Sequence, residues 1–152
     1  MTSVRGTSQS RDVRRHGPLA WVRLARVFQK VERASGEHLR RWDLSVAQFD
    51  VLAHVGASEG VVQHDLAESL LVTEGNVCQL LDRMEGRGLI LRRREGRTNR
   101  LFLTDGGRRV FDEVVPAHEA VISERFSALS VGEQEQLHEL LRTLDRALDD
   151  QA

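Results

Sequence analysis

The sequence is poor in cysteine and contains no long apolar run, and each absence narrows the class of protein. Its single cysteine, Cys78, excludes a disulfide within the chain and favours a reducing compartment. No segment approaches the ~18 consecutive apolar residues that a membrane-spanning helix needs. The segment from Met1 to His16 is polar and lacks the apolar block of a secretory signal peptide. Together these absences predict a soluble, cytoplasmic protein with no membrane association.

Motifs for catalysis and for cofactor or metal binding are also absent from the sequence. There is no phosphate-binding loop, no glycine-rich dinucleotide turn and no nucleophile elbow. The histidines form no pair four residues apart and no cluster with the cysteine (His16, His38, His54, His64, His118 and His138). A metal site would have to be assembled by folding, and scattered surface or core histidines are the simpler interpretation. We expect neither an enzyme nor a bound cofactor or metal ion.

The formal net charge of −1 gives no indication of a nucleic-acid partner, but the distribution of charge does. Residues 83–109 contain nine arginines and only three acidic residues, with Asp82 at the border. From Asp112 onward, ten acidic residues face only three arginines. A basic middle followed by an acidic end is typical of a DNA-facing region joined to one that faces away from DNA. Charge alone leaves two ordinary solvated faces as an alternative.

Helical spacing of the apolar residues predicts a mainly α protein with one small β-hairpin (α+β). We expect residues 1–17 to form a flexible basic arm and Pro18 to occupy the first turn of a helix. That helix is predicted to run from about Leu19 to Arg41. A capping-box pattern at Ser45 predicts the start of a second helix.

Two more helices and the hairpin are predicted in the middle of the chain. A third helix contains the apolar positions Leu66, Ala67, Leu70 and Leu71, and Thr73 is the expected N-cap of a fourth. Strands over 89–94 and 100–103 flank a turn at 95–99. The last two helices are expected to begin at polar N-cap residues, namely Thr104 or Asp105, and Ser130.

The fourth helix has the polarity expected of a recognition helix. Its apolar positions place the opposite face outward, and that face holds Gly75, Asn76, Gln79, Asp82 and Arg83. The side chains of Asn76 and Gln79 each offer a donor and an acceptor to a base edge in the major groove. Thr73 and the free amides of the first turn suit a phosphate. The alternative is an ordinary helical hairpin with a solvated polar face.

The hairpin carries five arginines close to one short turn: Arg92, Arg93, Arg94, Arg97 and Arg100. Their mutual repulsion is unfavourable unless an anion lies nearby, and a guanidinium at a hairpin tip suits a minor groove or phosphates. We therefore predict DNA contacts from Arg94, Arg97, Thr98 and Asn99, with Arg97 at the tip. Solvated surface arginines are the alternative.

Taken in order and spacing, the motifs resemble those of the MarR family of bacterial transcriptional regulators over roughly residues 19 to 148. The matching segments are 44–52 (LSVAQFDVL), 65–67 (DLA), 72–77 (VTEGNV), 81–89 (LDRMEGRGL), 103–107 (LTDGG) and 129–133 (LSVGE). The resemblance implies a winged helix-turn-helix lobe over 45–109. It also implies a dimerisation helix over 18–44 and C-terminal dimerisation helices over 110–152.

The same resemblance implies a homodimer that binds a pseudo-palindromic site on double-stranded DNA and represses transcription. It also implies that a ligand, often a small aromatic or phenolic compound, modulates this repression. The family's wing usually reads Asp-x-Arg, with the acid holding the arginine, whereas this chain has Glu95-Gly96-Arg97. Arg97 matches the arginine of the family motif. Glu95 is longer than the usual aspartate, so the change of residue puts in question whether it holds Arg97 in the same way. For Arg83, the resemblance implies either positioning of the wing or direct contact with DNA.

Aromatic residues on the first two helices are candidates for an effector site. In the family these helices flank a crevice, and here they hold Trp21, Trp42 and Phe49, with His38 and His118 as polar partners. Plain core packing is the alternative. Cys78, beside the recognition face, is either a redox-sensitive thiol or a helix residue with no redox role. The overall prediction is a DNA-binding regulator, and the alternative is a winged-helix protein-interaction module without operator binding.

Overall fold

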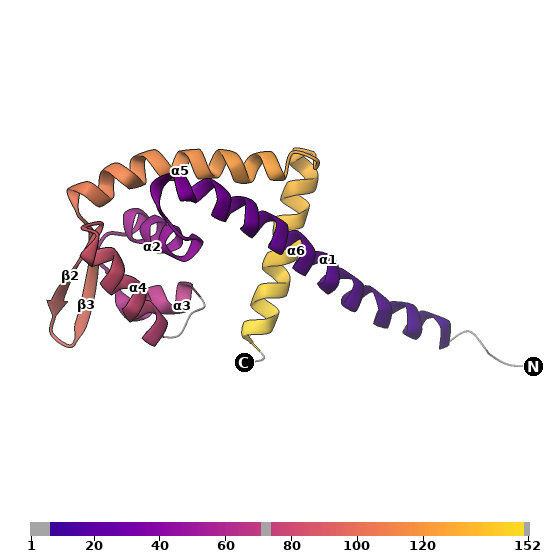
Figure 1. Ribbon diagram of the computed structural model, residues 1–152. Helices are drawn as coiled ribbons and strands as arrows, with labels where there is room; N and C mark the ends of the chain where they lie inside the picture. The colour runs from indigo at the N-terminus through magenta and orange to yellow at the C-terminus, as the bar shows by residue number, and fades with distance from the viewer. Residues whose placement is uncertain (1–6, 71–73, 151–152) are drawn as a thin grey trace, which may run out of the picture.

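The computed structural model describes residues 7–70 and 74–150, in which helices predominate around a small three-stranded sheet (Figure 1). In chain order the elements are α1 (Thr7–Leu39), the short 3-10 helix η1 (Arg40–Trp42), α2 (Val46–Ala57), β1 (Val61–Val62), α3 (Gln63–Ser69), α4 (Glu74–Gly86), β2 (Ile90–Glu95), β3 (Thr98–Leu103), α5 (Asp105–Arg125) and α6 (Val131–Asp149). The strands are antiparallel in the order β1-β3-β2. The predicted fold class, mainly α with a small hairpin, is confirmed.

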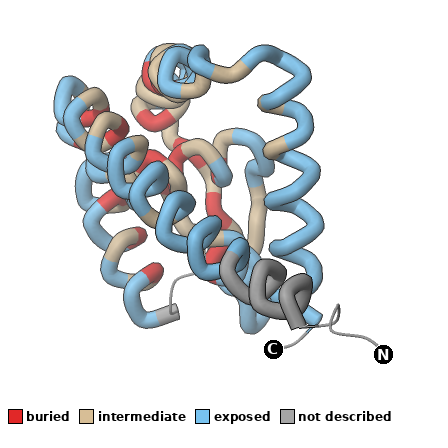
Figure 2. The backbone as a smooth tube through the Cα atoms, turned by 90° about the vertical axis from the view of Figure 1, so that its right-hand side faces the viewer, coloured by how far each residue is buried: buried red, intermediate tan, exposed pale blue. Residues whose placement is uncertain are grey.

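The elements form one lobe from which two helical segments project (Figure 1). α2, α3, α4 and the hairpin lie beneath α5 and the C-terminal part of α1, whereas α6 and the N-terminal part of α1 extend away from them. Burial follows the same division, because the buried residues gather in the lobe and along its junction with α1 and α5 (Figure 2). The fully buried side chains are Leu39, Val51, Leu52, Val55, Leu66, Val77, Leu81, Met84, Ile90, Leu101 and Val114.

The predicted helix starts at Ser45, Thr104 and Ser130 are confirmed, whereas the predicted cap Thr73 lies outside the described residues. Ser45 forms a complete capping box with Gln48 at the start of α2, and Ser130 does the same with Glu133 at the start of α6. The side chain of Thr104 accepts a hydrogen bond from the Gly107 amide and caps α5.

The prediction of a flexible arm is wrong for residues 7–17, because α1 begins at Thr7 and contains Pro18 in its interior. Pro18 is a typical start signal for a helix, yet the fixed φ of proline is itself helical and is also compatible with the interior of α1. Residues 7–16 contain neither glycine nor proline, so nothing in them stops the helix from continuing toward the N-terminus. Residues 1–6 lie outside the described part of the chain.

The turn of the hairpin is shorter than predicted. β2 and β3 pair from Ile90 opposite Leu103 to Glu95 opposite Thr98, which leaves only Gly96 and Arg97 in the turn. Gly96 has a φ of +61°, the left-handed value that a two-residue turn with glycine first requires. Thr98 and Asn99, predicted in the turn, therefore lie in β3.

Two smaller features also differ from expectation. α3 has 7 residues and ends at Ser69, with Leu70 as its C-cap, so it is shorter than the predicted third helix. β1 has only two residues and was not predicted, because so short a segment carries no alternating pattern. No helix in the described ranges is both long and apolar enough to cross a membrane.

Candidate nucleic-acid interface

α4 presents one buried and one exposed face, as its sequence predicts. Val77, Leu81 and Met84 are fully buried against the lobe. Gly75, Asn76, Gln79 and Arg83 are all exposed on the other side, so the structure brings these predicted contacts together on one helical surface. Asn76 already engages another group of the chain. Thr73, the predicted N-cap and phosphate contact, lies outside the described residues.

The register of the hairpin sorts its side chains onto two faces. Residues opposite each other in an antiparallel pair share a face, and faces alternate along each strand. Arg92 pairs with Leu101 and Arg94 with Asn99, so Arg94 and Asn99 share the face that is buried at its base. Thr98 lies on the opposite face, and Arg97 lies in the turn. The four predicted wing contacts are thus close together but point in different directions.

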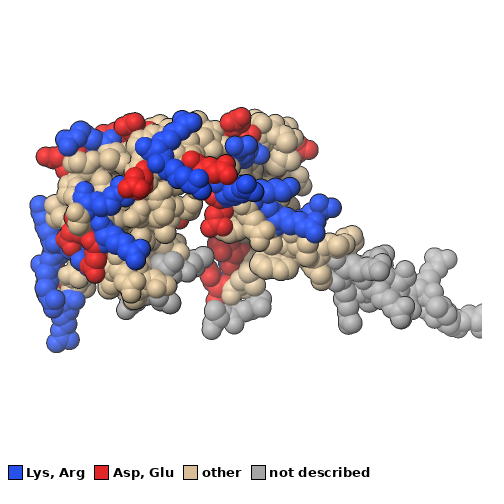
Figure 3. Space-filling model, viewed as in Figure 1, with Lys and Arg blue, Asp and Glu red and all other residues tan. Residues whose placement is uncertain are grey.

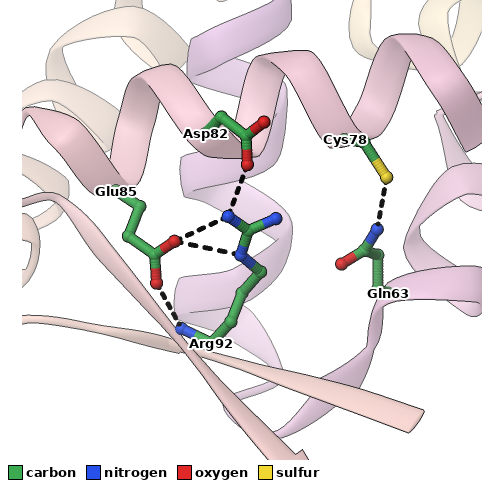
Figure 4. Close-up of polar contacts among 5 residues, drawn as sticks. All are labelled: Gln63, Cys78, Asp82, Glu85 and Arg92. Carbon is green, nitrogen blue, oxygen red and sulfur yellow. Dashed lines mark hydrogen bonds and ion pairs between the residues drawn. The ribbon is translucent and has the colours of Figure 1, made fainter. Parts of the chain in front are cut away.

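Most arginines of the hairpin are held by specific partners. Arg92 binds Asp82 and Glu85 of α4 (Figure 4), and the guanidinium of Arg93 lies 4.9 Å from the centre of the Phe102 ring. Arg94 Nε donates to the Gly96 carbonyl at 3.3 Å. Arg100 pairs with Glu95 and donates to the Gly60 carbonyl at 2.9 Å.

Arg97 and Arg83 differ from these held arginines. Within the described part of the chain, neither side chain has a hydrogen-bonding or ionic partner. Basic side chains extend along the hairpin to its end, as Figure 3 shows at the left edge of the molecule. The unpaired guanidinium groups are therefore placed where the helix surface and the hairpin tip meet solvent.

Arg87 is a residue that the sequence reasoning missed. It follows α4, and its Nη1 donates to the Asp43 carbonyl at 2.6 Å while Nη2 donates to the Trp42 carbonyl at 3.3 Å. Asp43 has a left-handed φ of +54°, so its carbonyl leaves the preceding helical path. These bonds join the chain at the end of α4 to the junction between α1 and α2. No local pattern could have revealed partners more than forty residues apart.

Cys78 contacts α3 rather than open solvent. Gln63 Nε2 lies 3.0 Å from its Sγ atom (Figure 4), and the thiol is half-buried. Both residues border a cavity of about 200 Å³ that also reaches Arg97, Thr98 and Asn99 of the wing. The pair connects α3 to α4, which accounts for Cys78 as a packing residue. Whether it also has a redox role stays an open prediction.

Four of the five predicted effector residues come together at the junction of α1, α2 and α5. The His38 ring centre lies 5.1 Å from that of Trp42 and 5.7 Å from that of His118. His118 in turn lies 4.3 Å from Phe49. Trp21 does not join them, since it is 67% exposed and about 25 Å further along α1 at 1.5 Å per residue.

The surroundings of the two histidines in this cluster lower their pKa values and so favour the neutral form. Burial lowers the pKa of His38, and the positive charge of Arg41 lowers it further. Burial also lowers the pKa of His118, with His38 as the second cause. Among the described residues, His38 Nε2 and His118 Nδ1 are buried and have no hydrogen-bond partner. The site thus combines aromatic rings with two unsatisfied imidazole nitrogens.

Comparison with known proteins places this geometry in a family. A model described as MarR family matches residues 42–100. An HTH-type transcriptional regulator of Bacillus cereus is 36% identical over 126 residues, which cover 82% of this chain and 86% of that protein. The chain belongs to the MarR family. It is accordingly a transcriptional regulator of the helix-turn-helix type.

Two solved structures of MarR family proteins share this fold. A variant of MarR from E. coli complexed with operator DNA has a TM-score of 0.76 and 26% identity, covering 84% of this chain and 93% of that one. A MarR family protein of Mycobacterium tuberculosis in complex with salicylic acid has a TM-score of 0.64 and 22% identity, covering 80% and 92%.

The wing departs from the MarR pattern at its acid. Glu95 pairs with Arg100 across the hairpin rather than with Arg97. Gly96 and Arg97 form the turn, and the guanidinium of Arg97 takes no part in this ion pair. The acid therefore stabilises the base of the tip and leaves Arg97 unbraced.

Proposed function

We propose that this MarR-family regulator is a homodimeric repressor that binds a pseudo-palindromic operator through α4 and the β2–β3 hairpin. The single observation that carries the proposal is the pairing of an exposed polar helix face with an unpaired arginine at the adjacent hairpin tip. Gln79 and Arg83 on α4 suit base edges and phosphates of a major groove. Arg97 suits the neighbouring minor groove or its phosphates.

The exposed apolar surface of the terminal helices supports a second copy of the chain as a partner. On α1, Trp21 and Phe28 are 67% and 61% exposed, and on α6, Leu140 and Leu148 are 62% and 56% exposed. Patches of this kind mark interaction surfaces in soluble proteins. Charge adds to this, because α1 carries seven basic and three acidic residues while α6 carries two basic and five acidic ones. A symmetric dimer lets each α1 meet an α6 of opposite charge.

A small aromatic or phenolic effector belongs to the same proposal. The cluster of His38, Trp42, Phe49 and His118 offers rings for stacking and two unpartnered nitrogens for a hydroxyl or carboxylate group. It lies where α1 and α5 meet the DNA lobe, so a bound molecule would alter how the lobe sits on the dimer. The structural relative that binds salicylic acid is consistent with such a ligand.

The decisive experiment selects fragments of genomic DNA with the purified protein and then measures affinity for the selected duplex and for a scrambled one. We expect specific binding with a steep dependence on salt, because the arginines displace counterions from phosphates. A reporter gene placed behind the selected site should lose expression when the protein is present. Failure to select any sequence, together with a co-purifying protein, would favour the interaction module instead.

The effector is tested by fluorescence in a Trp21→Phe variant, which leaves Trp42 as the only tryptophan. Titration with salicylate should change the emission of Trp42 and weaken binding of the selected duplex. His118→Phe should reduce both responses. Equal responses in the two proteins would place the effector elsewhere.

A further inference from the structure

Arg92 is the most extensively bonded arginine of the hairpin, and it does not face the tip. Its backbone amide donates to Glu85 Oε1 at 3.1 Å, and its Nε and Nη2 donate to Glu85 Oε2 at 3.0 and 2.7 Å. Nη2 also reaches Asp82 Oδ1 at 2.5 Å (Figure 4). Asp82 and Glu85 are three residues apart on α4, so one guanidinium spans one turn of the recognition helix.

The position of Arg92 in β2 makes this contact mechanically important. Burial decreases along the strand, from buried Ile90 through half-buried Leu91 and Arg92 to exposed residues from Arg93 onward. Arg92 is thus the outermost residue of β2 that is bonded to α4, and β2 is exposed beyond it. Residues 97–99 border the cavity that Gln63 and Cys78 share, but they are not bonded to α4 as Arg92 is. Its side chain is only 23% exposed, so water and salt screen these ion pairs less than ordinary surface pairs.

The other strand is held at a comparable level. Arg100 of β3 donates to the Gly60 carbonyl next to β1 and pairs with Glu95 of β2. The two arginines fix the hairpin from opposite sides, but only Arg92 connects it to the helix that carries Gln79 and Arg83. The separation between the helix surface and the hairpin tip therefore depends on Arg92.

Asp82 gives Arg92 a second effect on binding. This carboxylate is 63% exposed and lies beside Arg83 on the recognition helix, where an unpaired negative charge would repel phosphates. The guanidinium of Arg92 neutralises it while keeping its own charge away from the hairpin tip.

We infer that Arg92 is a positioning residue for DNA binding, which holds the wing against the recognition helix through Asp82 and Glu85 without contacting DNA itself. The inference rests on the proposed function, since it assumes that α4 and the wing bind one duplex together. A wing that is already ordered in the free protein loses less entropy when it binds.

Wing mobility is measured first in the free protein, without any DNA. A nitroxide spin label is attached at Thr98→Cys in a Cys78→Ser background, and its spectrum is compared with and without Arg92→Ala. Loss of Arg92 should make the label markedly more mobile. Arg93→Ala serves as the matched control, because Arg93 is the next residue but stacks on Phe102 and not on α4. Unchanged label mobility in Arg92→Ala would overturn the inference, whatever the outcome for DNA.

Affinity for the selected duplex is then measured with unlabelled proteins. Arg92→Ala should weaken binding about 10-fold or more, and Arg93→Ala clearly less, since a charged partly buried pair contributes more than a surface stack.

The charge-swapped protein Glu85→Arg/Arg92→Glu rebuilds the link, with the new arginine between Asp82 and the new glutamate. It should recover most of both the affinity and the label immobility. Recovery of immobility without affinity would identify Arg92 as a direct phosphate contact and overturn the inference. Failure of the unchanged protein to bind any duplex would refute the proposed function but not the mobility result.

Discussion

The DNA lobe and the terminal helices of this chain solve the problem of apolar surface in different ways. Every fully buried side chain except Leu39 and Val114 comes from the segment between α2 and β3. α6, by contrast, contains no buried residue (Figure 2), and its exposed side chains include Leu140, Leu141, Leu144 and Leu148. The lobe buries its apolar side chains against one another. The apolar side chains of the projecting helices leave water only if another surface covers them. The difference teaches that the residues that form the buried core and the residues that leave apolar surface exposed lie in separate parts of the sequence.

The largest effect is expected from substitutions in the exposed leucines of α6, which the proposed dimer would bury against a second copy of the chain. Leu140→Glu/Leu144→Glu places two charges in the leucine row of each α6 and should raise the dimer dissociation constant at least about 1,000-fold, given about 1.5–3 kcal/mol for each buried leucine. Sedimentation at several concentrations measures it. Gln136→Glu/Thr143→Glu adds the same charge outside the row and should leave the dimer intact. A monomer for the unchanged protein would break the comparison.

The next effect concerns close packing within the lobe. A Cβ at Gly107 would lie 1.8 Å from the Leu89 carbonyl oxygen, so Gly107→Ala must push α5 from the base of the hairpin. Overpacking of this kind costs about 1–3 kcal/mol of the free energy of unfolding. The same change at Gly132 of α6 meets nothing within 4 Å and should be neutral or slightly stabilising. Thermal unfolding followed by circular dichroism compares the two, and equal melting temperatures would contradict the division between tight lobe and open helix.

A smaller effect on DNA affinity should distinguish α4 from the hairpin within the lobe. Gln79→Ala should relax sequence preference, with a cost of about 1–3 kcal/mol confined to the selected duplex. Arg97→Ala should weaken binding to selected and scrambled duplexes alike and reduce the slope of affinity against salt. Anisotropy titrations at several salt concentrations measure both. Equal losses on both duplexes for Gln79→Ala would remove its role in base recognition.

The smallest effect is expected from pH at the junction of the two regions. The pKa values of His38 and His118 are lowered in the folded protein, first by burial, so the unfolded chain binds more protons below the ordinary pKa of histidine. Stability should therefore fall as the pH drops from about 6.5 toward the lowered values, and be fully present above that range. Urea unfolding at several pH values tests this. His118→Phe should flatten the dependence, and His138→Gln, in an exposed side chain of α6, should not.

Local signals account for the parts of the fold that the sequence predicted well. The capping boxes at Ser45 and Ser130 and the cap at Thr104 each depend on residues within three positions, so the pattern and the structure coincide. The inward and outward faces of α4 follow from helical spacing alone.

The misses arise where the three-dimensional arrangement decides which side chains meet. The partners of Arg87 lie more than forty residues away on the α1–α2 junction, and those of Arg92 lie seven and ten residues away on the neighbouring α4. The prediction places Trp21 with Trp42 and Phe49 because all three lie on the first two helices, but its position on the projecting part of α1 separates Trp21 from the aromatic cluster. Glu95 was considered as a brace for Arg97, and the two-residue turn instead directs it to Arg100.

The length of α1 has a consequence for the spacing of the operator. This helix has 33 residues, and its exposed apolar surface begins at Leu19, about 30 Å from the buried Leu39 in the lobe at 1.5 Å per residue. A rotation of roughly 8° at one end of such a rod displaces the other end by about 4 Å, more than the rise of about 3.4 Å per base pair. In a dimer, small differences in how two copies meet would therefore change the half-site separation that the recognition helices fit.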